Sequence, residues 1–91
     1  MVTTARGSVK SVYVSSIDIS DLQEIIMRFC MKWVHEQKIP IPRNEIVKYM
    51  ETKGVNMPTT RAAIYSLIKK GYIREAMTIS NKTSYVQLRS I

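Results

Sequence analysis

Apolar side chains recur every three or four residues between residues 20 and 37, and this spacing places them on one face of a helix. Ser20 followed by Gln23 forms the sequence pattern of a capping box, so the helix is expected to begin directly after Ser20. The pattern predicts a first helix ending near Gln37. Its core face is expected to comprise Leu22, Ile25, Ile26, Phe29 and Trp33.

Two more helical patterns follow the segment KIPIP at residues 38–42, which is expected to be extended because the residue before a proline avoids the helical region. Pro42 fits the first turn of a second helix, and Gly54 is expected to end that helix. Its buried edge is predicted to consist of Ile46, Val47 and Met50. Asn56 is a suitable N-cap for a third helix that ends at Gly71. The inward stripe of this helix is predicted to contain Met57, Thr60, Ile64, Leu67 and Ile68.

After the third helix the spacing of apolar residues changes from helical to alternating. The segments YIREAMTI (72–79) and SYVQLRSI (84–91) flank the sequence SNKT (80–83), in which Asn81 tolerates left-handed backbone geometry. This arrangement predicts a β-hairpin. At the other end of the chain, residues 1–19 are first polar and then rich in β-branched residues, which favours an extended or partly disordered arm.

The predicted order is helix, extended piece, helix, turn, helix and hairpin, which is the order of a winged helix-turn-helix. We therefore predict a mainly α fold with a small β-hairpin, in which three helices and a wing occupy residues 20–91. An arm at residues 1–19 precedes this domain. A chain of 91 residues is the size of a single domain.

Positive charge is concentrated in the last third of the chain. Residues 1–55 carry eight basic and six acidic side chains, a net charge of +2, whereas residues 56–91 carry six basic side chains and Glu75 alone, a net charge of +5. A cationic patch of this kind suits a polyanion such as a nucleic acid. The alternative is a surface that is basic by chance.

The third helix carries small side chains on the side opposite its predicted core face. On a helical wheel of about 100° per residue, Thr59, Ala62 and Ser66 lie there. A major groove about 12 Å wide admits a helix only if its side chains let the backbone approach closely. The pattern predicts a recognition helix in the major groove of double-stranded DNA.

Arg61, Tyr65 and Lys69 follow one another at intervals of four residues and form a ridge beside this small face. Arg61 lies in the second turn, where it is predicted to form a bidentate hydrogen bond with a guanine. Thr59 is predicted to hydrogen-bond a base or to contact a thymine methyl group. The N-terminal part of a recognition helix usually reads the bases, so later cations are expected at phosphates. The predicted phosphate contacts are Lys69, Lys70 and Arg74, with Lys82 of the hairpin at a neighbouring phosphate or minor groove.

Each of these residues also has a purely structural interpretation. Arg61 can pair with an acidic side chain, Tyr65 can cover an edge of the core, and Thr59 can help to cap its helix. The two lysines that end the helix favour the negative end of its dipole without any ligand, and Lys82 can be a solvated turn residue.

One long segment is similar to a known family of regulators. The sequence IPIPRNEIVKYMETKGVNMPTTRAAIYSLIKKGYI (39–73) resembles the DNA-binding domain of the LexA repressor family, with Glu-Ile on the second helix and a Thr-bearing recognition helix that ends in Lys-Lys-Gly-Tyr-Ile. The match covers roughly residues 20–91, and many of its positions are shared with winged helices of the MarR type. The resemblance implies a sequence-specific DNA-binding regulator that represses by occupying a promoter. A phage or mobile-element regulator fits a chain of this length.

The first helix also presents apolar residues away from its predicted core face. Met27, Met31 and Val34 are expected on that far side with Cys30 between them, and such a face needs a second cover. A second copy of the chain would provide it, which predicts a homodimer, and the N-terminal arm folding back is the alternative. The same face suits a different function, namely a protein-interaction module that binds a host repressor, a polymerase or a replication protein, or a replication initiator.

The sequence offers little for catalysis, metal binding or membrane insertion. His35 is the sole histidine and is expected at the surface, and no cluster of residues has metal-ligand spacing or forms a glycine-rich phosphate loop. We therefore expect no enzyme activity, no metal and no cofactor. Cys30 is expected to be a buried thiol, and the absence of a long apolar stretch predicts a cytoplasmic, nucleoid-associated protein without membrane contact.

Overall fold

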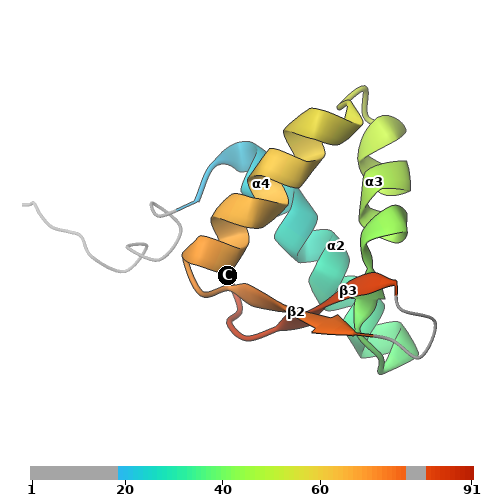
Figure 1. The fold of residues 1–91 in the computed structure, drawn as a ribbon, viewed down its shortest axis with the longest axis vertical. Helices are drawn as coiled ribbons and strands as arrows, with labels where there is room; N and C mark the ends of the chain where they lie inside the picture. Colours follow the sequence, from blue (N-terminus) through green and yellow to red (C-terminus); the bar gives the residue numbers. More distant parts are fainter. Residues whose placement is uncertain (1–18, 78–81) are drawn as a thin grey trace, which may run out of the picture.

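The computed structural model describes residues 19–77 and 82–91, which form three helices and three short strands (Figure 1). The expected arm lies outside the described residues apart from Ile19, and so does the turn residue Asn81. The elements occur in the predicted order, and the predicted fold class, three helices followed by a β-hairpin, is confirmed. None of the helices in the described part of the chain is long and apolar enough to cross a bilayer.

Helix α2 (Asp21–Gln37) begins where the capping box predicts. The Ser20 hydroxyl accepts a hydrogen bond from the backbone N–H of Gln23 at 3.2 Å, and the Gln23 side chain accepts one from the backbone N–H of Ser20 at 3.2 Å. These two bonds provide partners for N–H groups that a helix start otherwise leaves unpaired. The helix ends at Lys38, which adopts a left-handed conformation with φ of 62°.

The turns that follow the other two helices contain the glycines that the sequence indicates. Helix α3 (Arg43–Glu51) is followed by Gly54 with φ of 81°, and α4 (Met57–Lys69) is followed by Gly71 with φ of 83°. In both turns the residue after the glycine donates a backbone hydrogen bond of 3.0 Å to the carbonyl five residues earlier. This is the Schellman arrangement, which requires a left-handed residue and so favours glycine.

The strands form one antiparallel sheet in the order β1-β3-β2. Strands β2 (Ile73–Met77) and β3 (Thr83–Gln87) are the predicted hairpin, although both are shorter than the alternating segments of the sequence. Strand β1 (Ile41–Pro42) was predicted only as an extended piece and not as part of the sheet. Figure 1 shows the β2–β3 ribbon beside the C-terminal half of α4.

The short strand β1 fixes the start of α3 against the hairpin. Ile41 pairs with Tyr85 and Pro42 pairs with Ser84, so Arg43, the first residue of α3, follows directly from the sheet. Pro42 has no N–H to donate and occupies an edge strand, which is where sheets tolerate proline.

The core corrects the predicted orientation of α2. Met27 and Cys30, expected on an uncovered far face, are buried in the core at 0% and 1% exposure, and Met31 and Val34 are half-buried. The reason is that α2 contacts α3, α4, β1 and β3, so the chain itself covers the helix on several sides. Of the residues predicted as its core face, Ile26 is fully buried and the others are half-buried against the core, namely Leu22, Ile25, Phe29 and Trp33.

Helix α4 buries most of its predicted stripe. Thr60, Ile64 and Leu67 are buried as expected, Ala63 is buried with them, and Ile68 is half-buried. Met57 was wrongly predicted to be inside, since its side chain is 46% exposed. It is the first residue of α4 and lies beside the exposed turn between α3 and α4, beyond the reach of the core.

Candidate nucleic-acid interface

The outward face of α4 carries the residues that the sequence predicts as the reading surface. Thr59, Arg61, Ala62 and Lys69 are exposed, and Ser66 is half-buried. They lie there because the opposite side of α4 packs into the core through Thr60, Ala63, Ile64 and Leu67.

Two structural interpretations of this face do not fit the geometry. The side-chain oxygen of Asn56 accepts a hydrogen bond from the backbone N–H of Thr59 at 3.0 Å, so Asn56 caps α4 and the Thr59 hydroxyl is not needed for capping. The Tyr65 side chain is 62% exposed, so it does not cover an edge of the core. Thr59 and Tyr65 therefore both present side chains to solvent.

The two lysines at the end of α4 lie in different environments. Lys69 is exposed, and its Nζ lies 5.4 Å from the centre of the Tyr65 ring, which is a cation–π distance. Lys70 is half-buried, and its Nζ donates a hydrogen bond of 2.9 Å to Oε1 of Gln23 at the start of α2. The structure thus places Lys69 on the outward surface and directs Lys70 toward α2.

The basic residues of the hairpin are also separated. Arg74 and Glu75 are consecutive residues of β2, so their side chains point to opposite faces of the sheet. Glu75 lines a cavity beside α4, which places Arg74 on the other face. Lys82 is exposed before β3 and lines a small hollow of about 150 Å³ together with Pro42, Arg43, Asn44 and Thr83.

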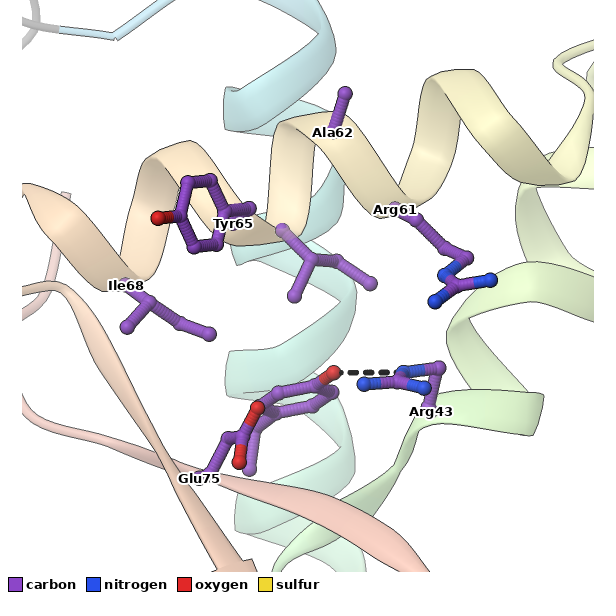
Figure 2. A pocket seen from close by; sticks show the side chains of 8 residues that line it. Arg43, Arg61, Ala62, Tyr65, Ile68 and Glu75 are labelled. Atoms are coloured by element: carbon purple, nitrogen blue, oxygen red, sulfur yellow. Dashed lines mark hydrogen bonds between the residues drawn. The ribbon is translucent and has the colours of Figure 1, made fainter.

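A larger cavity of about 340 Å³ lies between α4 and the sheet (Figure 2). Figure 2 shows Arg61 reaching down from α4 toward the guanidinium group of Arg43. The lining residues come from the start of α3, from α4 and from the hairpin: Arg43, Arg61, Ala62, Ile64, Tyr65, Ile68, Glu75 and Tyr85.

Arg43 was not identified from the sequence, and the hairpin holds it in place. Its Nε donates a hydrogen bond of 2.8 Å to the hydroxyl of Tyr85, and its Cζ lies 5.9 Å from the centre of that ring. Tyr85 is only 1% exposed, so the residue that holds Arg43 is itself packed in the core. The sequence does contain a signal for this residue. Arg43 is a cation in the first turn of a helix, where the helix dipole disfavours positive charge, so its position there suggests a specific role.

The cavity carries a net positive charge, because two arginines and one glutamate line it. Within the described part of the chain, neither Arg43 nor Arg61 forms an ion pair, and neither does Glu75. Two guanidinium groups that share a concave surface without a paired carboxylate raise the local potential, which favours an anion.

The groups considered for other chemistry lie apart from this surface. Cys30 is buried, as expected from the sequence, and burial raises the pKa of its thiol from its ordinary 9.0 to about 12. His35 is exposed near the end of α2, as expected. Among residues 19–77 and 82–91, no group of three His, Cys, Asp or Glu side chains is placed to hold a metal ion.

The three helices and the hairpin, with the outward face of α4 beside it, define a winged helix-turn-helix. The chain is similar to the crystal structure of MepR, a transcription regulator of the Staphylococcus aureus multidrug efflux pump MepA and a winged-helix protein of the MarR family. The TM-score is 0.64 at 16% identity, and the match covers 82% of this chain and 51% of the MepR chain.

This likeness shows the fold, and the chain spans about half the length of the MepR chain. It supports the winged helix without bearing specifically on the LexA family. No protein-family model matches the sequence, and no curated protein matches it either.

Proposed function

We propose that this protein is a transcription regulator that binds double-stranded DNA by inserting α4 into the major groove. The observation that carries the proposal is the outward face of α4, where the small side chains of Thr59, Ala62 and Ser66 allow close approach to the bases. Lys69 beside this face would contact phosphates, and Lys82 on the hairpin side would contact the neighbouring backbone or minor groove. The similarity to a transcription regulator of the same fold supports the proposal.

The finer assignments belong to the same proposal. The protein would act as a repressor by occupying a promoter, and it would bind as a homodimer, because two half-sites double the contacts available to a small reader. With Met27 and Cys30 buried in the core, the surface left for pairing along α2 includes the half-buried Met31 and Val34. Arg74 remains a proposed phosphate contact, although its side chain points away from the cavity. The hydrogen bond from Lys70 to Gln23 supports a structural role for Lys70 in place of the phosphate contact predicted from the sequence.

Selection of bound fragments from a random duplex pool tests the proposal. We expect an enriched motif, and a palindrome within it would indicate a dimer. Affinity for the enriched duplex should fall steeply with salt, because each neutralised phosphate contributes a slope of about 0.9. Failure to bind any duplex at low salt would reject the function.

A matched pair of variants links this binding to α4. Ala62→Glu adds one negative charge and bulk at the centre of the reading face, and it should abolish duplex binding. His35→Glu makes the same charge change at an exposed position near the end of α2, and it should leave binding close to that of the unmodified protein. Equal effects of the two variants would argue against α4 as the reading element.

A second candidate function is a protein-interaction module, and one observation favours it. An apolar hollow of about 560 Å³ lies at the end of α2 beside the sheet, lined in part by Val34, Ile39, Pro40 and Val86, and Ile39 is 55% exposed. If this hollow binds a partner protein, Ile39→Lys should abolish that interaction in a binding assay while leaving duplex affinity unchanged.

A further inference from the structure

We infer that Arg43 and Arg61 together bind the sugar-phosphate backbone that separates the major groove from the adjacent minor groove. This inference rests on the proposed DNA-binding function and deepens it by assigning a second contact surface behind the reading face. The site is the cavity of about 340 Å³ between α4 and the hairpin. Its ligand is a stretch of DNA phosphates, and each arginine neutralises one of them.

The geometry of DNA places a backbone at this cavity. The major and minor grooves of a duplex are separated by a single sugar-phosphate strand, so a protein with a helix in one groove and a hairpin at the next must straddle that strand. The cavity lies between α4 and the hairpin, which is the position that the strand would occupy (Figure 2).

Arg43 is organised for this contact before any ligand arrives. The pairing of β1 with β3 sets Arg43 beside Tyr85, and the 2.8 Å bond from Nε to the Tyr85 hydroxyl uses one donor of the guanidinium group. In the described part of the chain, no other hydrogen bond of the Arg43 side chain is found, so its two terminal amino groups are available for phosphate oxygens. Because the side chain is already held, it loses little conformational freedom on binding.

The charge of the site also favours an anion. Arg43 occupies the first position of the nine-residue helix α3, where the dipole opposes a cation, and Arg61 extends toward it from α4. Glu75 lines the same cavity without forming an ion pair to either arginine in the described structure. A bound phosphate would offset the repulsion between the two guanidinium groups and the repulsion between Arg43 and the dipole of α3. Phosphate binding therefore explains the position of the two arginines, which solubility alone does not.

Arg43 also connects this cavity with the hollow that Lys82 lines. Its side chain borders both spaces, so basic groups run from Arg61 through Arg43 to Lys82, from α4 toward the wing. Such a track matches successive phosphates of one strand. It also changes the role predicted for Arg61 from the sequence, because an arginine committed to the backbone does not read a guanine.

The test compares salt dependence for two duplexes, one enriched by selection and one of scrambled sequence. Arg43→Gln and Arg61→Gln should each lower affinity several-fold for both duplexes, and each should reduce the slope of log K against log salt by about 0.9. Lys32→Gln removes one charge from the exposed face of α2 opposite Cys30, and it should change neither quantity. Thermal unfolding of every variant checks that the fold is retained.

Arg43→Lys provides a second variant if Arg43→Gln unfolds. It keeps the charge but loses the planar fork, so it should retain the slope and still bind more weakly. A neutral methylphosphonate placed at single positions of the enriched duplex should identify one phosphate at which the Arg43 substitution no longer has an effect.

The possible results separate the inference from the function it rests on. If the unmodified protein binds duplex DNA but Arg43→Gln binds equally well, the inference is wrong and the proposed function stands. A loss confined to the enriched duplex for Arg61→Gln would show base reading and would also overturn the inference. If the unmodified protein binds neither duplex, the proposed function fails and this site falls with it.

Discussion

Lys70, the C-cap residue of α4, donates a hydrogen bond of 2.9 Å from Nζ to Oε1 of Gln23, which belongs to the capping box of α2. Two residues 47 positions apart thus join the end of the proposed reading helix to the start of the central helix. The adjacent lysine, Lys69, points outward instead and lies over the Tyr65 ring. The two neighbouring lysines therefore make different contacts: Lys70 joins two helices, and Lys69 lies on the outward surface.

A pair of glutamine substitutions should separate these roles. Lys70→Gln loses a partly buried, charge-assisted hydrogen bond and should lower the free energy of unfolding by about 1 kcal/mol, with a small effect on duplex affinity. Lys69→Gln should leave stability unchanged and weaken binding to all duplexes. Urea unfolding and fluorescence anisotropy measure the two quantities. The same loss of affinity in both variants would show that Lys70 also contacts DNA.

Tyr85→Phe should loosen the Arg43 guanidinium without changing the charge of the protein. The variant removes the hydroxyl that accepts the 2.8 Å bond, so the free energy of unfolding should fall by about 1 kcal/mol. Duplex affinity should fall modestly while the salt slope stays the same, because both arginines remain. Tyr65→Phe, at an exposed tyrosine, is the control for stability. An unchanged affinity in Tyr85→Phe would mean that the anchor is irrelevant to binding.

Thr60→Val should stabilise the protein. The Thr60 side chain is 0% exposed, and its hydroxyl has no hydrogen-bond partner within the described structure. Replacing a buried unpaired hydroxyl with a methyl group of similar size removes a desolvation cost, which predicts a gain of about 1 kcal/mol in the free energy of unfolding. Thr59→Val at the exposed neighbour should show no such gain. A destabilised Thr60→Val variant would indicate that the hydroxyl has a partner after all.

Alkaline pH should destabilise the fold through Cys30. The pKa of its thiol is raised to about 12 by burial, against an ordinary 9.0, so between these values the unfolded chain loses a proton that the folded protein keeps. Stability contributed by the protonated thiol is therefore lost as pH rises above 9.0. Cys30→Ala is the reference, because it lacks the thiol and keeps every other group of the protein. The unmodified protein should lose more stability than this variant, and equal pH profiles would contradict the burial effect.

Labelling with a thiol reagent gives an independent check on the same residue. Because Cys30 is 1% exposed, it should react in native buffer only as fast as the protein opens, and at once in urea. Rapid labelling under native conditions would show that the face of α2 around Met27 and Cys30 is accessible, and it would contradict the burial of Cys30 in the core.

The starts of α2 and α4 and the turns after α3 and α4 could be predicted from the sequence alone, because they depend on local interactions. The reciprocal bonds of Ser20 and Gln23, the cap at Asn56 and the left-handed glycines at 54 and 71 depend on residues within five positions of one another. Such signals need no knowledge of the rest of the fold. The small outward face of α4 was predictable for the same reason, because helical periodicity alone places Thr59, Ala62 and Ser66 together.

Only the tertiary structure decided which face of α2 is innermost and where Arg43 lies. Helix α2 is apolar around most of its circumference, so periodicity cannot choose its buried side, and packing against α3, α4 and the sheet selected Met27 and Cys30. Arg43 meets Tyr85 across 42 positions of sequence because two residues of β1 pair with β3. A two-residue strand has no alternating pattern to detect, since its stability comes entirely from the partner strand that the fold brings beside it.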